Sequence, residues 1–151
     1  MPAVYQDIGL KFLYPENWSI IEEETYEWPR SVTIQSPGGA FWAVHVYPPL
    51  SDEEALMQEV IASIRSEFNE MEILEAEETI SDCPTHGYDM AFFYLDLLVE
   101  AHVRSLQTPS ATLIWLVQAE NKDYEENELV FQAMTKSMLD NVVASRGRNP
   151  S

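Results

Sequence analysis

The sequence predicts an α+β domain in which a largely antiparallel sheet is flanked by helices. Runs rich in aromatic and β-branched residues, which are typical of strands, fill residues 31–47 and residues 88–119. An amphipathic helical pattern separates these two series, and a second such pattern follows the last strand. Because the expected strands within each series are joined by short turns, we expect hairpins and therefore antiparallel pairing.

Four strands are predicted in the N-terminal part of the chain, before the first helix. The strands are residues 10–14, 18–22, 31–36 and 40–47, with a turn at residues 15–17. The loop between the third and fourth strands contains Gly38 and Gly39, which tolerate a positive φ. Pro48 and Pro49 then end the fourth strand, because proline cannot donate to the hydrogen-bond ladder.

A helix is predicted over residues 51–68. Ser51 and Glu54 have the spacing of a capping box, in which the serine caps the helix and the glutamate reaches back to it. Apolar residues then recur at helical spacing and form one stripe: Leu56, Met57, Val60, Ile61, Ile64 and Phe68. We expect this stripe to pack on the sheet.

The C-terminal half predicts four more strands and a closing helix. Residues 71–80 alternate and carry charge on both sides, which favours an edge strand. We expect a loop over residues 81–87, and strands over residues 88–95, 97–107 and 111–119. The closing helix spans residues 124–143, and its apolar face consists of Val130, Phe131, Met134, Met138 and Val142. Residues 1–144 are therefore expected to form a single domain, with a flexible tail at 145–151.

Composition limits the function classes. The 151 residues carry a formal net charge of −18, which disfavours binding to nucleic acid and to anionic membranes. Residues 51–80 alone hold ten acidic residues against one arginine. This acidic segment is either a solvated surface or a docking face for a basic partner. With one cysteine, no visible signal peptide and no long apolar run, we expect a cytoplasmic protein that is not inserted in a membrane.

Several short motifs resemble those of a known family. The segment Gly9-Leu10-Lys11-Phe12-Leu13-Tyr14-Pro15-Glu16-Asn17-Trp18 resembles the opening of the PsbP-like superfamily, which includes the photosystem II extrinsic subunit and the Mog-type Ran-binding import factors. The Ser-Pro-Gly loop, a helix ending in Phe68, a strand series opened by Gly87 and the closing helix around residues 131–138 are similar in order. The resemblance implies an α/β/α sandwich and an uncharacterised bacterial member of this group. It implies little about function, since members of the group serve as binding or assembly factors with no common active site. No functional residue of either named group matches a position here.

Two sets of residues are candidates for partner binding. Tyr26 and Trp28 lie in an acidic connection between two expected strands, and both residue types anchor interfaces well. Glu100, His102 and Arg104 alternate along an expected strand and therefore share one face. Each set also has an ordinary structural explanation, in which Trp28 covers the core edge and the stripe is a polar sheet surface.

Motifs for catalysis and cofactors are not found in the sequence. Cys83 and His86 form a Cys-x-x-His pair, which supplies two of the four ligands of a zinc site. As a nucleophile and its base, the same pair would need a third residue that orients the histidine. There is no Gly-x-Gly-x-x-Gly, Walker, Gly-x-Ser-x-Gly or His-Glu-x-x-His motif. We therefore assign no catalytic, cofactor or metal-binding residue.

The sequence favours a small acidic binding or assembly module that acts through a protein partner, for which a basic surface is one option. The alternative is a small-molecule binder or enzyme that uses a cleft between sheet and helix, with Cys83 and His86 as its candidate residues. A role in a bacterial secretion or envelope system is a third option, which an upstream signal peptide would favour. The sequence does not determine the partner or the oligomeric state.

Overall fold

The computed structural model describes residues 2–68 and 70–147. Five strands precede the first helix: β1 (Pro2–Asp7), β2 (Leu10–Pro15), β3 (Ser19–Glu24), β4 (Arg30–Gln35) and β5 (Phe41–Tyr47). The remaining elements of these residues are α1 (Glu53–Glu67), β6 (Met71–Ile80), β7 (Cys83–Tyr94), β8 (Leu97–Gln107), β9 (Thr112–Glu120) and α2 (Asn121–Gly147).

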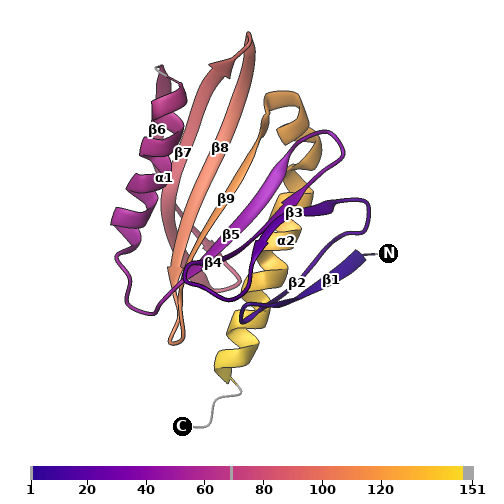
Figure 1. Ribbon diagram of the computed structural model, residues 1–151, viewed down its shortest axis with the longest axis vertical. Helices are drawn as coiled ribbons and strands as arrows, with labels where there is room; N and C mark the ends of the chain where they lie inside the picture. The colour runs from indigo at the N-terminus through magenta and orange to yellow at the C-terminus, as the bar shows by residue number, and fades with distance from the viewer. Residues whose placement is uncertain (1, 69, 148–151) are drawn as a thin grey trace.

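A seven-stranded antiparallel sheet forms the centre of the molecule (Figure 1). Its strand order is β3-β4-β5-β9-β8-β7-β6, so β6 lies at an edge, as the sequence predicts. Strands that follow one another in the sequence pair within each half of the sheet, β3 to β5 and β6 to β9. The pairing of β5 with β9 joins the two halves. The prediction of a largely antiparallel sheet flanked by helices is confirmed.

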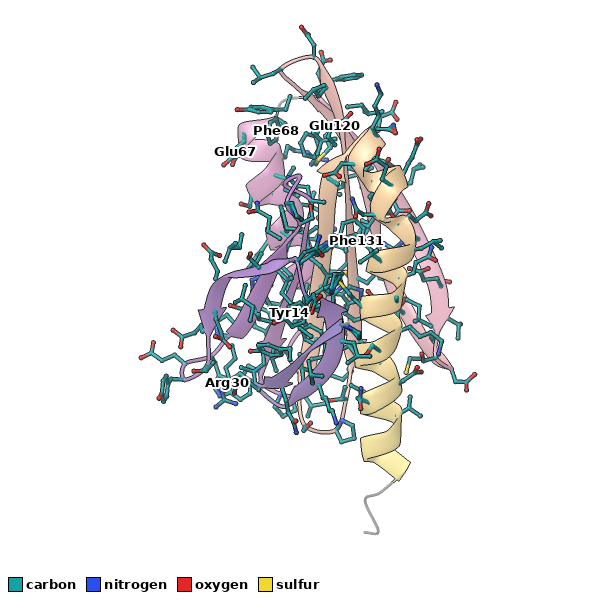
Figure 2. The ribbon with its side chains drawn as sticks, turned by 90° about the vertical axis from the view of Figure 1, so that its right-hand side faces the viewer. Tyr14, Arg30, Glu67, Phe68, Glu120 and Phe131 are labelled. Atoms are coloured by element: carbon teal, nitrogen blue, oxygen red, sulfur yellow. The ribbon has the colours of Figure 1, made fainter. Side chains whose placement is uncertain are left out.

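The two helices cover opposite faces of this sheet (Figure 2). The stripe of α1 is centred on Met57 and Ile61, which pack with Met90, Phe92 and Val103 of the sheet in one core. The other face contacts α2 and the β1–β2 hairpin, and its core holds the following large side chains: Phe12, Trp42, Trp115, Phe131, Met134 and Met138. The arrangement is an α/β/α sandwich with the hairpin beside α2.

The first strand of the structure is absent from the sequence prediction. The sequence predicts that residues 10–14 pair with the next strand, but β2 pairs instead with β1 in a separate two-stranded sheet. Tyr5 is the one buried side chain of β1, so the segment lacks the alternation that indicates a strand. The hairpin is fastened to the main body by Phe12, whose ring centroid lies 4.8 Å from that of Trp42.

Two local expectations are also wrong. In place of the loop expected over residues 81–87, β7 begins at Cys83, and a two-residue turn at Ser81 and Asp82, both with positive φ, joins it to β6. The helix α1 is capped by Asp52, whose carboxylate accepts from the Ala55 amide, and not by Ser51. Asp52 fits because aspartate is as good a cap as serine, and Ser51 donates instead to the Pro48 carbonyl.

The C-terminal helix is longer than expected. It begins at Asn121, directly after β9, and continues to Gly147, where the sequence predicts residues 124–143. Its predicted apolar face is confirmed, since Phe131, Met134 and Met138 are buried in the core. Residues 148–151 of the expected tail lie outside the described residues. Neither helix of the described chain is both long and apolar enough to cross a membrane.

Candidate functional site

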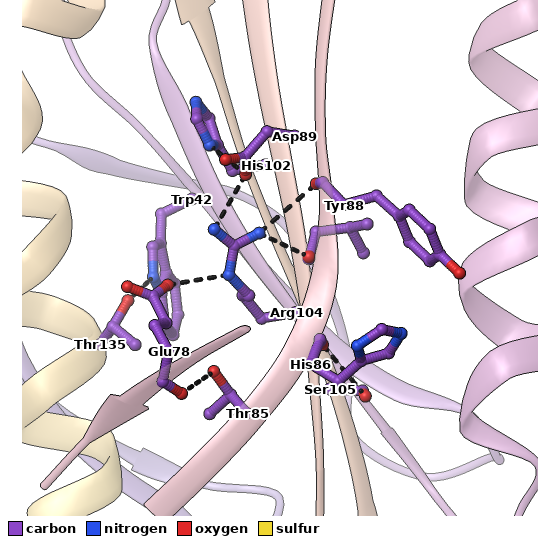
Figure 3. A network of polar contacts seen from close by, with 11 residues as sticks. Trp42, Glu78, Thr85, His86, Tyr88, Asp89, His102, Arg104, Ser105 and Thr135 are labelled. Carbon is purple, nitrogen blue, oxygen red and sulfur yellow. Dashed lines mark hydrogen bonds and ion pairs between the residues drawn. The ribbon is translucent and has the colours of Figure 1, made fainter. Parts of the chain in front are cut away.

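The three residues of the predicted β8 stripe lie on the α2 face of the sheet, and Arg104 is the most deeply placed. Figure 3 shows Arg104 and His102 with their partners. Its side chain is 9% exposed. Its Nε donates to Glu78 at 2.8 Å, and its Nη2 lies 2.8 Å from Asp89 Oδ1. Buried charges of this kind are stable only when paired, and two carboxylates meet that need here. Arg104 therefore joins β6, β7 and β8 beneath α2.

His102 extends the same network toward the helix. Its Nδ1 lies 2.6 Å from Asp89 Oδ1, and its ring stacks on Tyr124 of α2 with a centroid separation of 4.8 Å. Because an ionised carboxylate only accepts hydrogen bonds, Nδ1 is the protonated nitrogen. Nε2 lies 3.8 Å from Glu100 and makes no hydrogen bond within the described residues.

Electrostatics hold Asp89 in its charged form. Burial alone would raise the pKa of Asp89, but the hydrogen bond from His102, together with the charge and hydrogen bond of Arg104, outweighs it and keeps this pKa below its usual value. Tyr124 is affected in the opposite direction. Burial, followed by the nearby charges of Glu128 and Glu100, raises the pKa of Tyr124 to about 12.

An aspartate-oriented imidazole is also what a general base requires. Such a base needs a nucleophile within reach of its free nitrogen, and Nε2 of His102 faces Glu100 instead. The arrangement instead favours a structural role, in which His102 stabilises the packing of α2 on β7 and β8. A role of Glu100, His102 and Arg104 in partner binding stays a prediction, and Glu100 has the most accessible side chain of the three, at 28%.

His86 lies on the opposite face of the sheet, among carboxylates. Its Nε2 lies 3.5 Å from Glu54 of α1 and 3.5 Å from Glu75 of β6, and its Nδ1 lies 3.9 Å from Glu77. Glu54 also accepts a hydrogen bond from Tyr88. The hydrogen bonds from Tyr88 and Gln58 lower the pKa of Glu54.

The structure does not bring the thiol of Cys83 to His86. The two residues are three apart on β7, so their side chains point to opposite faces of the sheet. Cys83 is 1% exposed in the core beneath α2, whereas His86 contacts Glu54 on the α1 side. The nucleophile pair that the sequence left open is therefore not formed.

A pocket of about 630 Å³ opens beside His86. Its lining includes Glu53 of α1, Glu77 and Glu78 of β6, and Thr85 and Gln107 of the neighbouring strands. Because the carboxylate of Glu78 is bound to Arg104, Glu53 and Glu77 are the acidic side chains of this lining that suit a cationic ligand.

The connection between β3 and β4 presents its aromatic side chains to solvent. Tyr26 is 87% exposed and Trp28 is 45% exposed, whereas Trp18 and Trp115 are buried. The guanidinium of Arg30 lies 4.1 Å from the centroid of the Trp28 ring, within the range of a cation–π contact.

The backbone of this connection is held by a carboxylate. Glu24 accepts hydrogen bonds from the amides of Tyr26 and Glu27, at 3.0 and 3.4 Å. These bonds lower the pKa of Glu24. The backbone of the loop is therefore held in a hydrogen-bonded turn, and its two aromatic side chains project from this turn.

The antiparallel sheet, the two helical layers and the added hairpin form an α+β fold that is similar to the fold of PsbP. No protein-family model and no curated protein sequence matches the chain. Among solved structures, cyanobacterial PsbP (CyanoP) from Synechocystis aligns with a TM-score of 0.60 and 11% identity over 90% of each chain. A Pseudomonas aeruginosa protein of unknown function aligns with a TM-score of 0.52 and 9% identity, over 91% of this chain and 95% of that one. The likeness establishes the fold alone, and the Mog-type part of the resemblance stays a prediction.

Proposed function

We propose that this chain is a small acidic binding or assembly module that recruits a protein partner through the loop at residues 25–29. The observation that carries the proposal is the display of Tyr26 and Trp28, which are 87% and 45% exposed on a hydrogen-bonded turn. Large aromatic side chains on an ordered surface lose little conformational entropy on binding and bury much area, so they serve well as interface anchors.

The charge around the loop indicates the kind of partner. The two aromatic residues are flanked by four glutamates: Glu22, Glu23, Glu24 and Glu27. The nearby positive charge of Arg30 lies over the Trp28 ring. An acidic rim around an aromatic anchor complements a basic surface that has an apolar centre, and such complementarity speeds encounter and rejects acidic competitors. A basic protein partner therefore fits this loop best.

Affinity capture from the native cells tests the proposal. The tagged wild-type chain is compared with Trp28→Ala, with Tyr26→Ala and with the control Leu129→Ala, which truncates a 78% exposed side chain on α2. We expect a basic protein that is retained by the wild type and by the control but depleted at least tenfold with Trp28→Ala. Equal capture by all four proteins would remove the loop from the proposal, and Glu100 would be the next residue to replace.

The pocket beside His86 supports the alternative, a small-molecule binder that uses the space between sheet and helix. Glu53 and Glu77 in its wall favour a cationic molecule such as a polyamine. Calorimetric titration with spermidine would show binding that Glu77→Gln weakens and that Glu126→Gln, an exposed α2 control, leaves unchanged. If neither variant changes the heat, the pocket does not hold such a cation.

A further inference from the structure

The hairpin tip between β7 and β8 extends beyond the rest of the sheet. In the ladder, β6 begins with Met71 opposite Phe92, and β9 ends with Glu120 opposite Val99. The residues between these positions, 93–98, consequently have no strand beside the hairpin. Figure 1 shows this tip as the highest point of the molecule. We refer to residues 93–97 as the tip.

The tip is apolar and exposed to solvent. Phe93 is 68% exposed, Tyr94 53%, Leu95 78% and Leu97 51%. Single exposed apolar residues are ordinary, but a contiguous group is typical of a contact surface. Four neighbouring residues of this kind on one projecting hairpin therefore require an explanation other than the folding of this domain.

The turn itself does not explain the choice of residues. Leu95 and Asp96 both have positive φ, at 50° and 64°, in a two-residue hairpin turn. Asparagine and glycine suit such positions, whereas leucine is disfavoured there. A leucine that is disfavoured by the turn and contributes little to the core indicates a role outside the domain.

The tip is nevertheless held in place at its base. Phe68, at the end of α1, stacks on Phe92 with a centroid separation of 4.4 Å. The same ring meets Tyr94 edge-on at 5.7 Å. The tip thus projects from an aromatic support, which reduces the entropy that binding would cost.

Charge around the tip selects among the possible occupants. The residues at and nearest the tip, 70–74 and 90–100, contain four acidic residues and no lysine or arginine. Glu72 and Glu100 flank Ala91 at the base of the tip, and Asp96 lies in its turn. This negative charge repels an anionic bilayer and a second copy of the same tip, and it attracts lysines and arginines.

We propose that the tip inserts into an apolar pocket of another protein whose rim carries lysine or arginine. This contact is separate from the loop at residues 25–29, which precedes Arg30 at the opposite end of the ladder, where Arg30 pairs with Val46 and Gln107 with Thr112. A chain with contact surfaces at both ends of its sheet can join two proteins.

Photo-crosslinking in the native cells tests this contact. p-Benzoylphenylalanine replaces Leu95 in one chain and Leu129, 78% exposed on α2, in a control chain. After irradiation, the crosslinked peptides are sequenced. We expect a product specific to position 95, joined to an apolar position of another protein that has lysines or arginines beside it. The further change Phe93→Ser should reduce its yield at least fivefold while the circular dichroism spectrum stays unchanged.

Three outcomes would overturn the proposal. They are a product that joins two copies of this chain, a product shared with position 129, and the absence of any tip-specific product. Co-flotation of the purified chain with phosphatidylglycerol or phosphatidylcholine vesicles that Phe93→Ser abolishes would also overturn it, in favour of a membrane. Trp28→Ala separates the two surfaces: the tip product should persist with this change, and its loss would refute an independent contact at the tip.

Discussion

Gly87 and Arg104 face each other across the β7–β8 ladder, and the arginine side chain uses the space that a β-carbon on the glycine would fill. Such a carbon would lie 2.9 Å from Cδ of Arg104 and 1.8 Å from the carbonyl oxygen of Val103. The absence of a side chain at this position lets Arg104 lie along the sheet and reach Glu78 and Asp89.

Gly87→Ala should therefore destabilise the fold. The added carbon forces the Val103 backbone and the arginine apart, and overpacking of this kind costs about 1–3 kcal/mol. Urea unfolding measures the change in free energy. Gly38→Ala is the matched control, because the nearest atoms to its β-carbon would be the carboxylate oxygens of Asp123, at 3.3 Å. Equal losses in the two variants would show that the contact between Gly87 and Arg104 is not the cause.

Asp89→Asn should reduce stability at neutral pH and not at low pH. The pKa of Asp89 in the fold lies below its ordinary value of 3.8, so its contribution is complete above that value and is lost as the pH falls through the lower folded-state pKa. At pH 7 the loss of charged hydrogen bonds to His102 and Arg104 should cost about 1.5–3 kcal/mol.

Unfolding in urea at several pH values between 2 and 7 checks this expectation. The difference between wild type and Asp89→Asn should shrink below pH 3.8, whereas Glu126→Gln on the exposed side of α2 should show little difference at any pH. A difference that is the same at pH 2 and pH 7 would mean that the carboxylate charge does not produce the stabilisation.

The net charge leads to a prediction about nucleic acids. At −18 the surface repels phosphates, so we expect no shift of a DNA or RNA duplex at about 0.15 M salt. Gel shift and filter binding measure this directly. A micromolar complex that weakens as salt increases would contradict this expectation, because such a complex requires a basic surface.

Elements with strong periodicity could be predicted from the sequence. The α1 stripe around Met57 and Ile61 and the α2 face around Met134 have helical spacing, and packing on the sheet follows from it. The strand β1 could not be found, because Tyr5 alone is buried in it. The turn at Ser81 and Asp82 could not be found either, because Pro84 favours a loop and because the two turn residues lack the Asn-Gly signal.

Only part of the candidate site could be predicted from the sequence. Alternation along β8 placed Glu100, His102 and Arg104 on one face, but their partners Asp89 and Glu78 come from other strands, and the register that brings them together depends on the whole sheet. The exposed tip at residues 93–97 looks like ordinary strand sequence. The tip can be recognised only from the strand pairing, in which β6 begins opposite Phe92 and β9 ends opposite Val99.

Trp28→Ala should cost far less stability than Trp115→Ala. Trp115 is 3% exposed in the core beneath α2, and truncation of a buried tryptophan costs about 3–5 kcal/mol. Trp28 is 45% exposed, and its contact with Arg30 is of a kind worth about 0.5–1 kcal/mol at exposed sites. Urea unfolding of both variants measures the two losses, with Leu129→Ala as a surface reference. Since the interface proposal needs a tryptophan that the fold can spare, a loss with Trp28→Ala that equals the loss with Trp115→Ala would make Trp28 a structural residue and remove the main support for partner binding at this loop.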